Sequence, residues 1–526
     1  MSDASPTSTS RRRALLGGAT AAVAAGGAAV TAPIAAADGR GGHGRGQGSG
    51  HGHQHGTARA ATGVPIVSIP RQGGVIATSP DPATMFTALP ASTEVAPTVI
   101  DVGAPLRGRR IEGFGGALTH SAATLLLQMG TKRRSALLTD LFSPTGAHRL
   151  NALRIPLGTS DFTTDADYYT FADWKGPSAD PLRHLSIERD EASILPVLRE
   201  ILAINPQLTV LMSPWSAPAW MKTSGSLIGG SLHDDARTRA LYAEYLARSV
   251  QEYRRRVRHL EVAAISVQNE PLHGEAQYPC MTMTADEQVD VIARTQDALA
   301  RHHQSTEVYV YDHNWDHPEY PIEVLDGLAA KRRDAWGVGF HAYGGDAASA
   351  GDAVQEAHPG ARIWLTEQTG TRNLEKSYPE NFAECLSWMS TNLFLPSLAH
   401  RHRGVILFNL VLDEDGGPGP STFTNGTGLV QWEADGTKLT PNAELLVMSH
   451  FSRFVTPGSQ LVETSVDGEG LLCVGARSGG RDVVVVHNNR EPRDVSVRRS
   501  RSVRGHVLTA KIPAVALATF VLGEGR

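Results

Sequence analysis

The sequence is poor in several features that mark particular classes of protein. Only three cysteines, Cys280, Cys385 and Cys473, occur in 526 residues. Their odd number and wide spacing fit neither a disulfide framework nor a zinc site, so we interpret them as structural. A net charge of −5 indicates no basic surface for nucleic acid or for an anionic membrane. After the N-terminal region no apolar run is long enough to span a membrane, so stable membrane insertion is not expected.

The N-terminal region has the pattern of an export signal. Consecutive arginines at 11–13 precede an Ala- and Gly-rich stretch, and Ala35 and Ala37 form a small-residue cleavage pattern. This arrangement predicts a twin-arginine signal over residues 1–37 and a secreted, extracellular protein. A membrane anchor is the weaker interpretation, because alanine and glycine carry too little hydrophobicity for a stable span.

The next segment, residues 38–61, is rich in Gly, His and Ser and cannot bury enough apolar surface to order itself. We predict a disordered linker. His51, His53 and His55 could hold a metal loosely, but flexible tracts of this kind more often bind nothing specific.

Short apolar segments recur between residues 108 and 445, each ending in polar or aromatic residues. In order they are "RRIEGFGG", "NALRIPLGTSDF", "LTVLMSPWSAPAW", "EVAAISVQNEP", "EVYVYDHNWD", "WGVGFHAYGG", "ARIWLTEQTG" and "GVILFNLVLDED". Helical patterns separate them, for example at 235–256 and 284–303. Eight strand–helix alternations predict an α/β fold, a closed (β/α)8 TIM barrel whose active site lies at the carboxyl ends of the strands.

Both flanks of the barrel look strand-rich. Residues 62–107 contain "VPIVSIP" and "EVAPTVIDV", and residues 446–526 contain "GLLCVGA", "DVVVVHNN" and "VALATFVL". Their β-branched runs and turn residues predict strands. We therefore expect a β-sandwich domain, built from both ends of the chain, packed on the barrel.

Two glutamates stand at strand tips. Glu270 in "QNEP" follows the fourth strand and Glu367 in "LTEQTG" ends the seventh, 97 residues later. A lone glutamate at a strand end is usually a solvated rim residue. Two that face each other across a barrel mouth can break a glycosidic bond, because one gives a proton to the leaving oxygen while the other meets the anomeric carbon.

Neighbouring residues support a sugar site. Asn269 could bond a sugar hydroxyl, and Trp215, Trp220 and Trp315 could offer apolar faces to a ring, although tryptophan more often packs in a core. A metal-dependent barrel hydrolase is a weaker alternative, since His120, His313 and His341 are scattered without carboxylates at ligand spacing. We expect no metal and no cofactor.

Seven collinear motifs extend the argument. They are "GFGGALTHSAA", "LRIPLGTSDF", "LMSPWSAPAWMKTSG", "QNEP", "GFHAYGG", "LTEQTG" and "HFSRFVTPGSQ". Together they resemble glycoside hydrolase family 30, which contains lysosomal glucocerebrosidase. The resemblance implies a retaining β-glycosidase in which Glu270 is the acid/base and Glu367 the nucleophile.

The resemblance also implies roles for other residues. Arg154 matches the arginine that keeps the nucleophile ionised, and Asn269 matches the contact to the 2-hydroxyl. Asp161 and Trp215 match residues of the sugar subsite. His341 and Tyr343 match the tip of strand six, where a tyrosine hydroxyl bonds the nucleophile.

Three departures from glucocerebrosidase affect the substrate. Ala342 replaces an aromatic residue, Phe408 in the sugar subsite replaces a tryptophan, and Gln368-Thr369 replaces Ala-Cys. We expect hydrolysis of a β-glucoside, glycolipid or oligosaccharide, in the manner of a glucosylceramidase. The alternatives are an endo-β-1,6-glucanase or a β-xylosidase of the same family, and more remotely an inactive carbohydrate-binding barrel.

Overall fold

The computed structural model describes residues 60–163, 168–177, 179–418, 424–433, 436, 438–500 and 506–523. The predicted export signal and residues 38–59 of the predicted linker, with His51, His53 and His55, lie outside the described residues. Within the described part of the chain, none of the helices combines the length and apolar character needed to cross a membrane.

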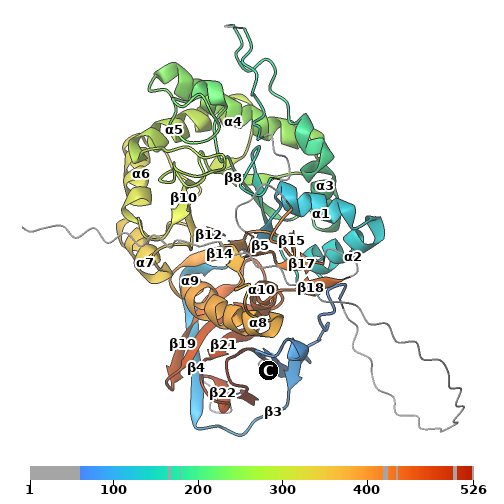
Figure 1. Cartoon of the computed structure of the whole chain (residues 1–526). Coiled ribbons are helices and arrows are strands. Elements are labelled where there is room, and N and C mark those ends of the chain that lie inside the picture. Colours follow the sequence, from blue (N-terminus) through green and yellow to red (C-terminus); the bar gives the residue numbers. More distant parts are fainter. Residues whose placement is uncertain are drawn as a thin grey trace, which may run out of the picture. The chain divides into compact units, whose positions relative to one another are not determined.

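A closed parallel barrel forms the centre of the fold, as predicted (Figure 1). Its strands are β5 (Gly113–Ala117), β6 (Ala152–Pro156), β7 (Thr209–Ser213), β8 (Val262–Ile265), β9 (Glu307–Val308), β10 (Val310–Asn314), β11 (Val338–His341), β12 (Ile363–Glu367) and β14 (His402–Leu407). β9 pairs with β8, and β10 pairs with β11. β9 and β10 therefore act as one interrupted fifth strand, which closes the ring.

Helices α3 to α7 surround the strands in Figure 1. The described helices are α1 (His120–Gln128), α2 (Thr131–Phe142), α3 (Ile194–Ile204), α4 (Ala236–Arg256), α5 (Ala285–Arg301), α6 (Glu319–Ala330), α7 (Ala347–Ala357), α8 (Tyr378–Trp388), α9 (Leu395–Ala399) and α10 (Ala443–Ser452). Sequence signals fix their ends. Asp235 caps α4, and Thr284 with Glu287 forms a capping box on α5.

An apolar plug fills the lower barrel. The ring of Trp364 occupies the space beside β14, where a Cβ at Gly404 would lie 2.6 Å from the indole. Ala152, Leu211 and Ile406 belong to the same buried cluster. Large side chains opposite glycine therefore fill the interior of the barrel below its mouth.

The sandwich uses both ends of the chain, as predicted. Its sheet runs in the order β2-β1-β24-β21-β20-β19-β4-β22-β23-β3. These strands are β1 (Gly73–Thr78), β2 (Thr87–Leu89), β3 (Ala91–Ser92), β4 (Thr98–Arg110), β19 (Gln460–Asp467), β20 (Leu471–Ser478), β21 (Arg481–Asn488), β22 (Arg493–Arg499), β23 (Val507–Ile512) and β24 (Ala516–Leu522). The strand predicted for "VPIVSIP" is wrong: residues 64–70 form only an isolated β-bridge at Pro65 and no strand, because prolines lack the N–H that a continued ladder needs.

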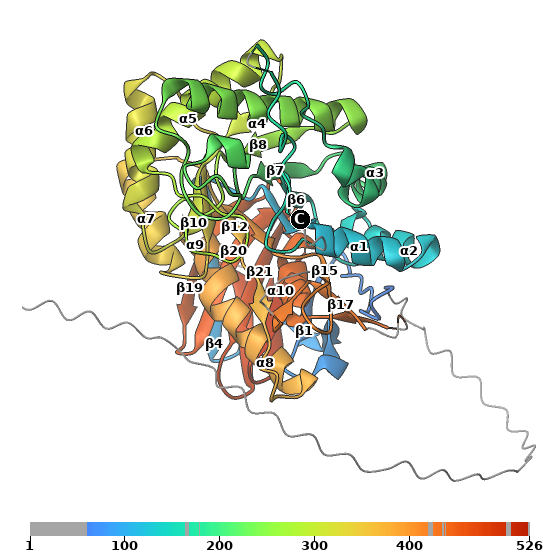
Figure 2. The same ribbon diagram turned by 45° about the horizontal axis from the view of Figure 1, so that its top comes forward.

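Polar contacts join the barrel to the sandwich. His450 of α10 is fully buried and bonds Thr519 of β24 at 2.8 Å and Thr78 of β1 at 2.9 Å. Burial lowers the pKa of His450 to about 3, so the ring is neutral. Figure 2 shows α10 beside the sandwich strands.

Short elements complete the described part. Three short 3₁₀ helices span Pro82–Thr84, Glu188–Ala192 and Ala219–Met221, and a π-helical turn at Met389–Phe394 joins α8 to α9. Two small sheets lie beyond β12 and β14: β13 (Gly370–Thr371) with β16 (Gly426–Thr427), and β15 (Val411–Asp413) with β17 (Val430–Trp432) and β18 (Leu439–Pro441).

Candidate active site

The carboxyl ends of the barrel strands surround a cavity of about 350 Å³. Glu367, the last residue of β12, and Glu270, which follows β8, both line it. Four other predicted site residues also line it: Asp161, Trp215, Asn269 and Tyr343. Arg154, His341 and Phe408 contact these residues from behind. The structure thus brings all nine predicted site residues together.

Two side chains hold the carboxylate of Glu367. Arg154, fully buried in β6, donates from Nη1 to Oε2. Tyr343 donates its hydroxyl to Oε1 at 3.0 Å, and that hydroxyl accepts the backbone N–H of Thr369 at 2.9 Å. Each carboxylate oxygen therefore has its own donor, which fixes the orientation of the group.

Asp312, which the sequence motifs did not indicate, ties these groups together. Asp312 of β10 is fully buried, and its Oδ2 accepts from Arg154 Nη2 at 2.9 Å and from Ser213 at 2.6 Å. Its Oδ1 accepts from Thr366 at 2.7 Å and faces Nε2 of His341 at 3.2 Å. Burial alone would raise the pKa of Asp312, but Arg154 and His341 hold it well below its ordinary value. A charged residue inside the apolar run "EVYVYDHN" was the available signal.

Backbone geometry places Asp312 and Glu270 next to each other. Asp312 has a φ of +68° and lies where the pairing of β10 with β11 shifts register. Its carbonyl accepts the backbone N–H of Glu270 at 2.9 Å, and Glu270 has a φ of +49°. Non-glycine residues rarely adopt this conformation, and such residues concentrate at functional sites.

His341 lies between the carboxylates. Its Nδ1 is 2.9 Å from Oε1 of Glu270 and 3.9 Å from Oε1 of Glu367. Burial alone would lower the pKa of His341, but the charges of Glu367, Asp312 and Glu270 raise it to about 9. The ring is therefore an imidazolium near neutral pH, with an N–H toward Glu270 and an N–H toward Asp312.

The two glutamates differ in proton affinity. Burial would raise the pKa of Glu270, but the hydrogen bond from His341 lowers it overall. Burial raises the pKa of Glu367, and the charges of His341 and Arg154 oppose that rise. Arg154 thus acts in the predicted direction, but burial outweighs it. The carboxyls interact strongly, so they titrate as a pair.

Other residues shape the place for a sugar. The oxygen of the Asn269 side chain accepts from Arg154 at 2.7 Å, which leaves its N–H groups to donate into the cavity. Trp215 and Phe408 stack with their ring centroids 5.8 Å apart. Burial and the nearby charges of Glu367 and Glu270 raise the pKa of Asp161 well above its ordinary value.

Other candidates from the sequence lie elsewhere or serve packing. Trp220 bonds the carbonyl of Ala172, and Trp315 bonds His402 in the interior, so neither lines the cavity. His120 bonds Tyr169, away from the glutamates. The three cysteines, all in the described part of the chain, form no disulfide.

One cluster has the spacing of a metal site. Glu270, His341 and Glu367 each offer a ligand atom within 4.8 Å of the others. Both ring nitrogens of His341 face carboxylates, however, and its raised pKa keeps both protonated near neutral pH. A protonated nitrogen has no lone pair for a metal. The residues fit a charge-balanced hydrogen-bond network better than a metal site.

Comparison with known proteins agrees with this geometry. The model of the glycosyl hydrolase family 30 TIM-barrel domain matches residues 111–455. An endo-1,6-β-D-glucanase of Neurospora crassa is 29% identical over 416 residues, 76% of this chain and 83% of that protein. Lysosomal acid glucosylceramidase of Mus musculus is 27% identical over 437 residues, 78% of this chain and 81% of that protein.

A solved structure extends the likeness to the fold. SrfJ from Salmonella typhimurium superposes with a TM-score of 0.76 at 26% identity, over 86% of this chain and all of that chain, 100%. The family match spans the barrel and both glutamates of the cavity. This chain therefore belongs to glycosyl hydrolase family 30 and is a glycoside hydrolase that acts on a glycan.

Proposed function

We propose that the protein is a retaining endo-β-1,6-glucanase in which Glu367 is the nucleophile and Glu270 the acid/base. One observation carries the retaining mechanism: a carboxylate oxygen of Glu270 and one of Glu367 lie within 4.8 Å of each other. Retaining enzymes hold their carboxyl groups about 5–5.5 Å apart, whereas inverting enzymes leave about 6.5–9.5 Å for a water.

The first step forms a glycosyl-enzyme. The reactive form holds the shared proton on Glu270 and leaves Glu367 ionised, although the pKa shifts of the free enzyme favour the reverse placement. Glu270 gives this proton to the glycosidic oxygen as an oxygen of Glu367 bonds to the anomeric carbon, and the aglycone leaves as an alcohol. Arg154 and Tyr343 hold the attacking carboxylate in place. Asn269 is positioned to donate to the 2-hydroxyl, a contact that strengthens as positive charge develops on the ring.

The second step releases the sugar. Ester formation neutralises Glu367, so the remaining negative charge of Glu270 no longer faces a like charge. Glu270 takes a proton from water, the hydroxide oxygen bonds to the anomeric carbon, and Glu367 leaves as a carboxylate. Two inversions at the same carbon retain the β configuration.

Two comparisons favour a glucan substrate over a glucosylceramide: sequence identity to characterised relatives, and residues of the site that differ from those of glucocerebrosidase. The Neurospora endo-1,6-β-D-glucanase is 29% identical, slightly more than the mouse glucosylceramidase at 27%. Phe408, Ala342 and the pair Gln368-Thr369 replace the residues that glucocerebrosidase has at these positions. A glucosylceramidase, the expectation from sequence, is the second candidate. The family's β-xylosidase activity has less support.

The decisive experiment is a substrate panel with product analysis. We expect hydrolysis of β-1,6-glucan to a ladder of oligosaccharides, weaker turnover of glucosylceramide and xylobiose, and a β-configured first product by proton NMR. Glu367→Gln is the matched inactive control. Turnover of glucosylceramide alone would assign the second candidate, and an α-configured first product would exclude retention. No turnover of any β-glycoside would favour the inactive binding barrel.

We also propose that the protein is exported by the twin-arginine route, which the arginines at 11–13 support. A reporter fused to residues 1–37 should be exported, and Arg12→Lys with Arg13→Lys should keep it inside. Unchanged secretion of the substituted fusion would contradict the route.

A further inference from the structure

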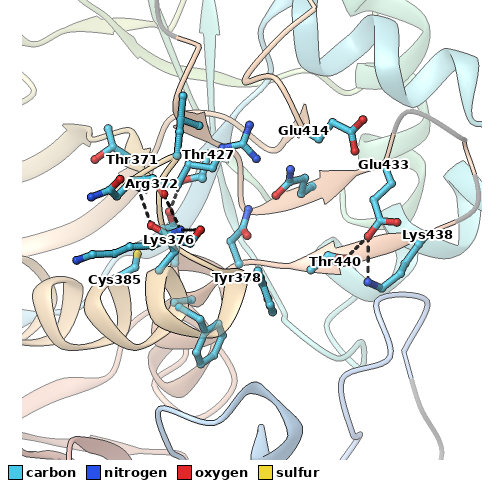
Figure 3. Close-up of a pocket in the computed structure, with 18 residues that line it drawn as sticks. Thr371, Arg372, Lys376, Tyr378, Cys385, Glu414, Thr427, Glu433, Lys438 and Thr440 are labelled. Carbon is cyan, nitrogen blue, oxygen red and sulfur yellow. Dashed lines mark hydrogen bonds and ion pairs between the residues drawn. The ribbon is translucent and has the colours of Figure 1, made fainter. Parts of the chain in front are cut away.

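A second cavity, of about 400 Å³, adjoins the active site. The loop after β12, helix α8, the sheet of β17 and β18, and the start of α10 enclose it. Figure 3 shows Thr371, Arg372 and Thr427 on one side of it and Glu433 and Lys438 on the other.

A short strand pair lies between the two cavities. β13 begins at Gly370, three residues after Glu367, and pairs with β16, with Thr371 opposite Gly426. Thr371 lines both cavities. A chain bound in the active site would therefore have to cross only this pair to reach the second cavity.

The floor of the second cavity is built from buried polar groups. Glu444 of α10 is 3% exposed and accepts from the hydroxyl of Thr427. A Cβ at Gly370 would lie 1.6 Å from Oε1 of Glu444, so the carboxyl packs directly beneath the strand pair. Burial raises the pKa of Glu444. The buried carboxyl of Glu444 lines the cavity. It therefore offers a ligand a hydrogen-bonding partner close to the wall that the cavity shares with the active site.

Donors and acceptors in the cavity suit a polyhydroxylated ligand. Nε of Arg372 is buried and has no hydrogen-bond partner among the described residues. The charges of Lys376 and Lys438 are balanced by Glu384 and Glu433. Tyr378, 37% exposed, directs its hydroxyl to the carbonyl of Pro441 and leaves its ring to cover a ligand. Unused donors, buried acceptors and an aromatic ring are what a polyhydroxylated ligand requires.

We propose that this cavity is a distal subsite that binds a further glucosyl unit of the same β-glucan chain that the active site cleaves. The inference rests on the proposed function, since only a polymeric substrate reaches both cavities. The distal subsite would make binding tighten with chain length, whereas an aryl β-glucoside would contact the active-site cavity alone.

The substitution Arg372→Ala tests the distal subsite directly. The Nε of Arg372 makes no hydrogen bond with the described residues, so the substitution removes none there. With β-1,6-linked glucose oligomers of two to six units, wild type should show a KM that falls as the oligomer lengthens. Arg372→Ala should remove that fall and raise the KM for the longest oligomer about 5–10-fold, the effect of one hydrogen bond. Its kcat/KM for an aryl β-glucoside should change less than about twofold.

Two further variants sharpen the result. Gln431→Ala, on β17 in the same cavity, should reproduce the chain-length effect. Arg107→Ala is the matched control, because this exposed arginine of β4 lies outside both cavities and should leave every KM unchanged. Equal KM values for long oligomers in wild type, Arg372→Ala and Gln431→Ala would overturn the distal subsite.

A binding measurement separates this inference from the proposed function. Calorimetric titration of Glu367→Gln with six-unit β-1,6-, β-1,3- and β-1,4-glucose oligomers reports affinity without turnover. If wild type cleaves an aryl β-glucoside but no β-1,6-glucan, the glucanase proposal fails. Weaker binding of any of the three oligomers after adding Arg372→Ala would still support the subsite, and unchanged binding of all three would overturn it.

Discussion

The barrel mouth and the sandwich are built on opposite principles. In the mouth Arg154, Asp312 and His341 are completely buried charged or chargeable groups, and Glu367 is 5% exposed. The inner face of the sandwich is apolar instead, with Val484, Val486 and Phe520 among its fully buried residues. One region concentrates charge where water is excluded, and the other excludes water by packing hydrocarbon.

This difference separates function from stability. Removing ions from water costs more than their mutual attraction usually returns, so a buried charge network is weak evidence of stabilisation. Buried apolar side chains each contribute about 1.5–3 kcal/mol. We infer that the mouth is retained for chemistry and that the sandwich contributes stability, and four substitutions can break or sharpen that contrast.

The largest effect should follow Glu367→Gln. Without the carboxylate no covalent intermediate forms, so kcat should fall at least about 10⁴-fold for every substrate, whatever its leaving group. The thermal midpoint should not fall, because an amide still accepts from Arg154 and one buried charge is gone. Steady-state kinetics and a thermal melt check both parts, and activity within tenfold of wild type would refute the assignment.

Glu270→Ala should be selective. Sugar and alkyl leaving groups need a proton, so their turnover should fall about 10²–10⁴-fold. A dinitrophenyl glycoside should still form the glycosyl-enzyme but release it slowly, and azide should restore turnover by giving a β-glycosyl azide. Equal losses for good and poor leaving groups, or an α-configured azide, would show that the roles are wrong.

Phe520→Ala probes the other region. Truncating this fully buried ring of β24 should lower the free energy of unfolding by about 3–5 kcal/mol. Folded molecules should keep the kcat of wild type on an aryl β-glucoside, because none of the sandwich residues that the structure describes lines the cavity. Val95→Ala, at a residue 57% exposed, is the control and should change stability by less than about 0.5 kcal/mol. A stable Phe520→Ala protein with low kcat would break the contrast.

The smallest effect concerns pH. The imidazolium of His341 favours the carboxylate form of Glu270 and so lowers its pKa. His341→Gln should therefore raise that pKa, keep the acid protonated to higher pH, and move the alkaline limb of kcat/KM upward by about 1–3 units.

A neighbouring histidine supplies the control for the pH profile. Burial lowers the pKa of His313 to about 4, so this ring is neutral over the working range. His341 contributes more than His313 to the lowered pKa of Glu270, so His313→Gln should move the alkaline limb much less than His341→Gln. A downward shift in His341→Gln, or equal shifts in both variants, would contradict the imidazolium at 341.

Sequence patterns predicted much of this protein because they act locally. Apolar periodicity indicated the strands and the helices at 235–256 and 284–303, and polar residues at strand ends indicated Glu270 and Glu367. One local pattern misleads: "VPIVSIP" is β-branched, but its prolines limit it to an isolated β-bridge.

What the tertiary structure alone decided is how distant residues share space. Asp312 lies in an apolar strand and gains its meaning only because Arg154, 158 residues before it, and His341 converge on it. The selection of Trp215 over Trp315 and Trp220, and the second cavity beside Thr371, are equally spatial. Charges, hydrogen bonds and cavities depend on distances between groups far apart in sequence, and folding sets those distances.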